Sequence, residues 1–185
     1  LRAIPALKVF RPADANETAG AWKVALEASD RPTALALTRQ GVPTLTDTTH
    51  EGVAKGAYVL ADSDGQPDVI LIAAGSEVHL ALGARETLAK DGISARVVSM
   101  PCDRLFLEQD GDYRESVLPR GVRARVAVEA GSPVGWGRFV GLDGEVVGLD
   151  RFGESAPGTE AYEHLGFTPD AVVEAASRTL KTTDA

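Results

Sequence analysis

The sequence predicts an α/β fold in which a mainly parallel β-sheet is flanked by helices. Short β-branched segments are apolar at consecutive positions, as in VILI at 69–72. Strands of a parallel sheet have this pattern because helices cover both of its faces. Segments with helical periodicity separate these apolar segments, and such alternation along the chain is typical of the α/β class.

Six apolar segments bounded by turn residues are predicted to form the strands. Several are rich in valine and isoleucine, which fit a pleated, buried surface. We expect the strands at 7–10, 33–38, 68–74, 93–100, 125–130 and 145–149.

Three capping residues predict where the main helices begin. The side chains of Asp14, Ser76 and Thr168 can each accept a hydrogen bond from a free N–H group in a first helical turn. Pro169 suits the first position of the last helix, because its fixed backbone angle is already helical. Gly92 is expected to end the second helix in a left-handed conformation.

The chain is expected to divide into three parts. Residues 1–40 have a strand–helix–strand pattern that is too short for a core of its own, so we interpret them as the tail of a larger domain. Apolar side chains such as Trp22 and Leu26 would then be exposed unless a partner covers them. Residues 41–67 are predicted to be a connector that can hold one strand at 57–60, and residues 68–185 a complete domain. Because the sequence begins with Leu1 rather than Met, we interpret it as a fragment.

Composition excludes several classes of partner. The net charge of −8 over 185 residues argues against nucleic acid or an anionic membrane as the main partner, because both require a basic surface. No apolar segment is long enough to span a bilayer. A single cysteine, Cys102, cannot form an internal disulfide and suits a reducing compartment, so we expect a cytoplasmic protein.

Arg39 is the strongest candidate for a binding residue. It follows the predicted strand 33–38, and ligands of parallel α/β sheets collect at the carboxyl ends of the strands. The planar guanidinium can bind two phosphate oxygens and keeps its charge at any working pH. The competing interpretation is a surface arginine that simply ends a strand.

Other possible sites have weaker signals. The turn at 73–77 could bind an anion, but Glu77 would repel it, which favours a plain helix start. The segment 135–141 departs from dinucleotide-binding spacing by one residue, and the acidic clusters at 62–65 and 110–112 lack the later ligands of calcium loops. The three histidines have no metal-binding spacing, and Asp103 disfavours a reactive Cys102 thiolate.

Blocks along nearly the whole chain resemble transketolases. Residues 10–43 are similar to the end of the family's pyrimidine-binding domain. Five later blocks resemble the C-terminal domain of bacterial transketolases in the same order: ILIAAGSEVHLAL, ARVVSMP, DYRESVLPRGVRARVAVEAG, DRFGESAP and HLGFTPDAVV. The fold implied is this C-terminal domain, preceded by a partial strand–helix–strand piece of a thiamine-binding α/β domain.

The resemblance implies an enzyme activity for the intact parent. Transketolases transfer a two-carbon ketol unit between phosphorylated ketose and aldose sugars in the pentose phosphate pathway, and they work as homodimers. The arginine of the family's S/T-R-Q-x-x-P motif contacts the substrate phosphate, and it matches Arg39 here. Sugar phosphates and the missing N-terminal part of the same chain are therefore the expected partners.

The resemblance also implies that the cofactor residues lie elsewhere. The family's catalytic glutamate, its aromatic pocket for the aminopyrimidine ring and its substrate-binding histidines would precede residue 1. The motif that holds thiamine diphosphate and a divalent metal, Mg²⁺ or Ca²⁺, belongs to a separate N-terminal domain. We therefore assign no catalytic, cofactor or metal residue to this segment and expect the segment alone to be inactive.

Two alternatives to a transketolase fragment stay open at this point. The chain could be a non-catalytic docking or regulatory module with a transketolase-like C-terminal fold. It could also come from a related thiamine diphosphate enzyme, a deoxyxylulose-phosphate synthase or a dehydrogenase β subunit. The motifs TRQGVP and FGESAP are more similar to those of transketolases.

Overall fold

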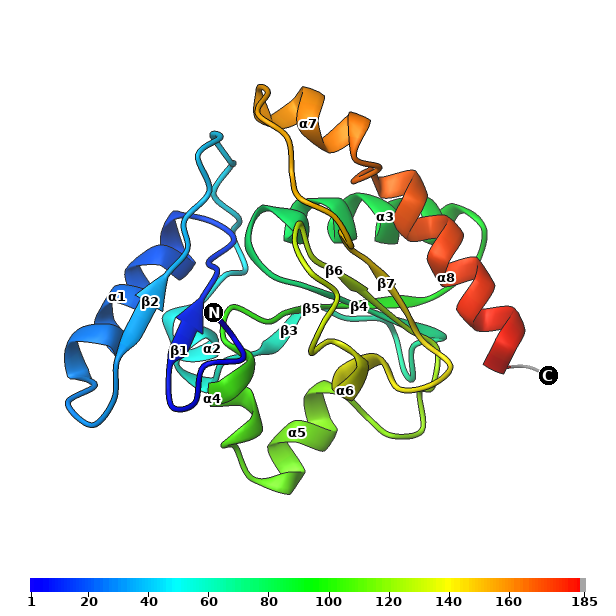
Figure 1. The fold of residues 1–185 in the computed structure, drawn as a ribbon. Coiled ribbons are helices and arrows are strands. Elements are labelled where there is room, and N and C mark those ends of the chain that lie inside the picture. Colours follow the sequence, from blue (N-terminus) through cyan, green and yellow to red (C-terminus); the bar gives the residue numbers. More distant parts are fainter. Residues whose placement is uncertain (184–185) are drawn as a thin grey trace.

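The structure, a computed structural model, describes residues 1–183 and contains two β-sheets (Figure 1). A two-stranded parallel sheet pairs β1 (Lys8–Phe10) with β2 (Thr33–Leu35). The main sheet has five strands in the order β3-β5-β4-β6-β7. These are β3 (Tyr58–Ala61), β4 (Val69–Ala73), β5 (Ala95–Ser99), β6 (Arg125–Val128) and β7 (Glu145–Val147).

The prediction of a mainly parallel α/β sheet is confirmed. Strands β4, β5, β6 and β7 pair in parallel, and only β3 runs antiparallel to its neighbour β5. All five residues of the central strand β4 are buried, as its uninterrupted apolar pattern predicts.

Helices cover both faces of the main sheet (Figure 1). On one face, Val69 and Leu71 of β4 pack with the buried sides of α3 (Val78–Lys90) and α8 (Pro169–Thr183). On the other face, Ile70 and Ile72 pack in a second cluster with residues of three short helices. These are α4 (Asp103–Leu107), α5 (Gly111–Val117) and α6 (Gly137–Val140).

The first segment packs against the connector. Helix α1 (Ala15–Glu27) contacts α2 (His50–Lys55), and Phe10 and Val53 share a small apolar cluster with Cys102. The outer side of α1 is open, with Trp22 52% and Leu26 80% exposed. Both side chains are therefore exposed, as the sequence predicts where no partner covers them.

The structure corrects three expectations about local structure. Strand β2 ends at Leu35 rather than at residue 38, and it is half-buried because it has a sheet neighbour on one side only. The connector contains helix α2, which the sequence pattern did not predict, and β3 joins the main sheet. Four further short helices, α4 to α6 and α7 (Gly158–His164), were also missed, because segments of 4–7 residues are too short to show helical periodicity.

Two of the three predicted caps are confirmed. Asp14 Oδ1 accepts a hydrogen bond from Glu17 N at 2.9 Å, and Thr168 Oγ1 accepts one from Ala171 N at 3.1 Å. Gly92 has the expected positive φ of 76°. The cap at Ser76 was wrong: this residue lies inside the 3₁₀ turn η1 (Gly75–Glu77), and its hydroxyl bonds to side chains instead.

In residues 1–183, no helix combines the length and the apolar character needed to cross a membrane.

Candidate functional site

Arg39 lies exposed in the loop after β2 and lines two adjoining pockets. The smaller, of about 340 Å³, is also lined by Arg11, Gly75 and Ser76. The larger, of about 520 Å³, lies between this loop and the chain around α7. Gln40 and Tyr162 line both pockets, so they join the two cavities into one hollow.

This hollow lies at the carboxyl ends of strands from both sheets. Arg11 follows β1, Gly75 follows β4 and Ala130 follows β6, and each of them lines one of the two pockets. Binding sites of parallel α/β sheets form at this edge because the loops there present polar groups to the ligand. Position in the fold therefore agrees with the position predicted for Arg39.

The guanidinium of Arg39 is available to an anionic ligand. Within residues 1–183 it has no carboxylate at ion-pairing distance, whereas Arg11 is paired with Glu77 and Glu129. Glu154, which lines the larger pocket, is held by Arg151 at 2.7 Å, and this hydrogen bond lowers the pKa of the Glu154 carboxyl.

A buried ion-pair network lies directly behind the smaller pocket. Arg11 Nη1 is 2.6 Å from Glu77 Oε2 and 2.7 Å from Glu129 Oε1, and the Glu77 side chain is fully buried. Burial by itself would lower the pKa of Arg11, but the charges of Glu77 and Glu129 outweigh it and raise this pKa above its ordinary value. The network joins the first segment, through Arg11, to strands β4 and β6 of the main sheet.

Tyr162 of α7 completes this network. Its hydroxyl lies 2.7 Å from Ser76 Oγ and donates a short hydrogen bond to Glu77 Oε1. Burial and the Glu77 charge raise the pKa of Tyr162 to about 12, so its hydroxyl keeps its proton near neutral pH.

A second buried polar group lies apart from this hollow. Glu17 of α1 accepts hydrogen bonds from Tyr58 Oη at 2.7 Å, Ser99 Oγ at 2.5 Å and Ala13 N at 2.7 Å. Burial raises the pKa of Glu17 above its ordinary value, although these hydrogen bonds oppose the rise. The group ties α1 to β3 and β5 of the main sheet.

The structure does not bring the weaker candidates together. His50 begins α2, His79 lies on α3, and His164 ends α7 with Nε2 3.3 Å from Glu154 Oε2. Within residues 1–183, no group of three or more histidine, cysteine or acidic side chains could hold a metal ion. Burial raises the pKa of Cys102 to about 11, which keeps its thiol protonated.

The remaining turns have structural roles. Asp110 caps α5 by accepting a hydrogen bond from Tyr113 N, and Asp62 pairs with Arg96 at 2.8 Å. The segment 135–141 contains the short helix α6, and the rings of Trp136 before it and Phe139 within it are buried edge to face. Glu77 does not face a ligand, because it is buried and paired with Arg11.

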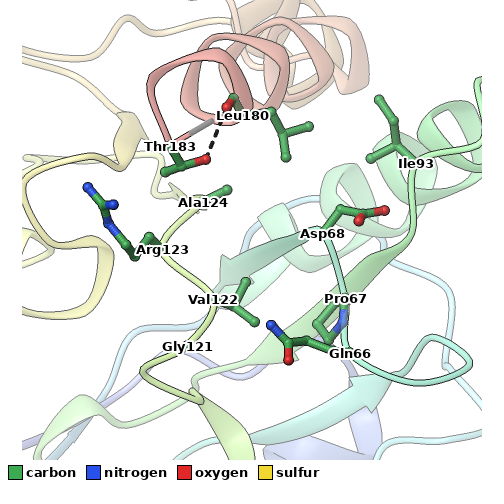
Figure 2. Close-up of a pocket in the computed structure, with 10 residues that line it drawn as sticks. All are labelled: Gln66, Pro67, Asp68, Ile93, Gly121, Val122, Arg123, Ala124, Leu180 and Thr183. Carbon is green, nitrogen blue, oxygen red and sulfur yellow. Dashed lines mark hydrogen bonds between the residues drawn. The ribbon is translucent and has the colours of Figure 1, made fainter. Parts of the chain in front are cut away.

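Another pocket, of about 590 Å³, lies at the opposite edge of the main sheet (Figure 2). It is lined by Asp68 before β4, by Arg123 before β6, and by Leu180 and Thr183 at the end of α8. Arg123 is already paired with Asp143 at 2.9 Å. Because this pocket lies at the amino ends of the strands, size alone does not make it the better candidate site.

The sequence pattern selected Arg39 and drew attention to the turn at 73–77, but it did not single out Arg11 or Glu129. Both of these directly follow strands, so the rule that selected Arg39 could have selected them. Tyr162 has no such signal, because α7 is short and its position at this edge depends on the path of the chain after β7.

Family models cover most of the chain. Residues 1–44 match the pyrimidine-binding domain of transketolase, and residues 56–168 match the transketolase-like C-terminal domain. Among curated relatives, transketolase from Halalkalibacterium halodurans is 53% identical over 98% of this chain and 28% of its own length. Transketolase from Aquifex aeolicus is 54% identical over 93% of this chain and 25% of its own length. The chain thus spans about a quarter of the length of these relatives.

Solved structures agree with this assignment. A transketolase from Pichia stipitis in complex with sedoheptulose 7-phosphate superposes with a TM-score of 0.92 at 41% identity, over 99% of this chain and 26% of that one. A structure described as a split-gene transketolase, an inactive β4 tetramer, has a TM-score of 0.74 at 31% identity, over 98% of this chain and 60% of that one.

The sequence matches favour transketolase over the other thiamine-dependent enzymes considered above, because the relatives at about half identity are transketolases. The order of the matched domains and the topology of both sheets lead to the same conclusion. The chain belongs to the transketolase family.

Proposed function

We propose that the chain is the C-terminal segment of a transketolase in which Arg39 binds the phosphate of the sugar substrate. The intact enzyme transfers a two-carbon ketol unit between ketose and aldose phosphates in the pentose phosphate pathway, as a cytoplasmic homodimer. The observation that carries the proposal is the guanidinium of Arg39, which has no carboxylate partner within residues 1–183 and lies in a hollow at the carboxyl edges of both sheets. The alternative of a free docking module has no comparable observation in its favour.

The negative net charge of the chain means that a phosphorylated ligand needs a local positive charge such as Arg39. The chain has a net charge of −8, so its overall field opposes a phosphorylated ligand. A guanidinium can offset this locally with two parallel hydrogen bonds to phosphate oxygens. The nearby carboxylates Glu77, Glu129 and Glu154 are each paired with an arginine, which limits their repulsion of the ligand.

Sugar phosphates are the proposed substrate class. Solved Pichia stipitis transketolases, 41% identical to this chain, include complexes with sedoheptulose 7-phosphate and with fructose 6-phosphate. We assign thiamine diphosphate and its divalent metal, Mg²⁺ or Ca²⁺, to parts of the enzyme outside this chain. When bound, this cofactor supplies the stabilisation of the carbanion that the ketol transfer requires.

Replacing Arg39 in the full-length enzyme tests the proposal. We expect Arg39→Ala to raise the KM for fructose 6-phosphate roughly tenfold or more, since a hydrogen bond to a charged group contributes about 1.5–3 kcal/mol. The KM for unphosphorylated fructose should stay unchanged. Steady-state kinetics with both sugars measure the difference.

The matched control is Arg123→Ala, which removes an arginine from the pocket at the opposite edge of the sheet (Figure 2). This variant should leave both KM values unchanged. An unchanged KM for fructose 6-phosphate in Arg39→Ala, or an equal increase for both sugars, would contradict the phosphate assignment.

A separately encoded subunit is a second arrangement for the same activity. The split-gene relative matches 98% of this chain, and its β4 tetramer is described as inactive. The chain could likewise complement a separate N-terminal subunit. Intact mass spectrometry of the native enzyme distinguishes a single long polypeptide from two short ones.

A further inference from the structure

We propose that Tyr162 of α7 is a positioning residue that holds the Arg39 loop, so that the C-terminal domain sets the affinity for the substrate phosphate. This inference rests on the proposed function of Arg39. Figure 1 shows the loop after β2 extending toward the end of the molecule where α7 lies, although these segments are far apart in the sequence.

The loop touches the first turn of α7 through Gln40, the residue next to Arg39. Gly158 packs so closely on this side chain that an added Cβ would lie 3.1 Å from Gln40 Cβ and 3.2 Å from its Oε1. A side chain at position 158 would therefore require the Gln40 side chain to move by a few tenths of an ångström. Because Gln40 is the residue next to Arg39, this contact places the start of α7 against the segment that carries Arg39.

Tyr162 lies one turn further along α7 and lines both pockets together with Gln40. Burial raises the pKa of Tyr162, and the Gln40 side chain is among the groups that partly offset this rise, as expected for neighbouring polar atoms. The aromatic ring packs against Phe167, with ring centroids 5.5 Å apart. The pockets that Tyr162 shares with Arg39 and Gln40 place this side chain beside the loop.

The hydroxyl of Tyr162 is held by a buried acceptor, the carboxylate of Glu77. It bonds to Ser76 Oγ and Glu77 Oε1, while the other carboxylate oxygen of Glu77 is held by Arg11 at 2.6 Å and by Ala130 N at 3.2 Å. Glu77 has an exposed fraction of 0%. A buried carboxylate with this many partners cannot rotate without leaving a charge unpaired, so it holds Tyr162 in one position.

The start of the loop is anchored to the same network. Ala36 N donates a hydrogen bond to Phe10 O at 2.8 Å. Arg11, which follows Phe10 in the sequence, pairs with Glu77. The loop is therefore held near Ala36 by the strand that carries Arg11, and at Gln40 it meets α7, which is bonded to Glu77 through Tyr162. Holding both ends reduces the freedom that Arg39 would lose on binding a phosphate, which strengthens binding without any new contact to the ligand.

Removing only the hydroxyl of Tyr162 in the full-length holoenzyme tests this role. We expect Tyr162→Phe to raise the KM for fructose 6-phosphate about three- to tenfold. The kcat for this sugar and the KM for unphosphorylated fructose should change less than about twofold. A purely structural role would not separate phosphorylated from unphosphorylated sugar. The matched control is Tyr113→Phe, because the Tyr113 hydroxyl bonds to Ala57 O on the other face of the sheet.

A double variant distinguishes this proposal from the one on which it rests. If Tyr162 acts through Arg39, then Tyr162→Phe should have no further effect on KM in an Arg39→Ala background. A rise in KM for Arg39→Ala with none for Tyr162→Phe would overturn the positioning role and leave the phosphate assignment standing. An unchanged KM in Arg39→Ala would overturn both.

Gly158→Ala provides an independent variant if Tyr162→Phe does not yield folded enzyme. It presses on Gln40 but keeps every hydrogen bond of Tyr162, and we expect the same selective rise in KM for the phosphorylated sugar. Thermal unfolding checks that each variant is folded. Equal rises in KM for both sugars, additive effects in the double variant, or no effect in either single variant would overturn the inference.

Discussion

Glu17 shows how a single buried carboxylate links pH to the stability of this chain. Among residues 1–183 its partners are three hydrogen-bond donors and no cation, and burial raises its pKa above the ordinary value of 4.5. The nearby Asp14 charge adds to the rise, and Tyr58 donates one of the hydrogen bonds. The folded chain therefore binds this proton more tightly than the unfolded chain does. The resulting stability is complete below pH 4.5 and is lost as the pH rises through the folded-state pKa.

Replacing Glu17 should remove this pH dependence. We expect the free energy of unfolding of the unmodified chain to fall more steeply than that of Glu17→Gln as the pH rises from 4.5 toward neutrality. Urea unfolding at several pH values gives the comparison. Glu27→Gln, an exposed change on the same helix, should follow the unmodified chain. The same pH profile for Glu17→Gln and the unmodified chain would contradict this account.

Residues near the candidate site differ in how far the sequence could identify them. Arg39 could be identified from the sequence, because a cation directly after a predicted strand indicates a possible anion site wherever the strand lies in the sheet. Tyr162 could not be identified in this way, because its partners Ser76 and Glu77 are more than eighty residues away in the sequence. No local pattern encodes a contact over that distance.

At the scale of elements, the sequence predicted those helix ends that depend on capping residues close by in the chain. Helix α8 begins at Pro169, directly after the capping hydroxyl of Thr168. Helix α3 is followed by Gly92 with positive φ, and Ile93 N bonds back to Leu88 O, which satisfies a free carbonyl of the last turn. Ser76 was mispredicted as a cap because Tyr162 and Glu77 compete for its hydroxyl.

The cap of α8 should make a measurable contribution to stability. We expect Thr168→Ala to lower the free energy of unfolding by about 1 kcal/mol, because Ala171 N loses its hydrogen-bond acceptor. The urea midpoint should fall without a change in the slope of the transition. Thr182→Ala, an exposed change in the last turn of α8, should have a smaller effect. Equal effects of both variants would argue against the capping role.

At the scale of the whole molecule, buried polar contacts join the first segment to the main sheet. Arg11 reaches Glu77 and Glu129, and Glu17 reaches Tyr58 and Ser99. Meanwhile the outer side of α1 leaves Trp22 and Leu26 exposed. The segment thus has a well-defined partner on one side and an uncovered apolar surface on the other. The proposed boundaries at 40 and 67 stay a prediction.

The chain by itself should not catalyse ketol transfer. Purified 185-residue chain, supplied with thiamine diphosphate, Mg²⁺ and a pair of sugar phosphates, is expected to show no turnover, since the proposal places the cofactor outside it. The full-length enzyme under the same conditions is the positive control. Turnover by the isolated chain would refute this division of the active site.

The sequence by itself determined the fold class, most strands, two helix caps and the candidate Arg39, because each depends on chemistry within a few neighbouring residues. The resemblance to transketolases was also readable there, since it depends on blocks of sequence in a fixed order. Only the tertiary structure decided that α2 and β3 organise the connector, and that Tyr162 meets Glu77 beside the Arg39 loop. The physical reason is that these contacts join residues far apart in the chain, and the packing of two sheets brings them together.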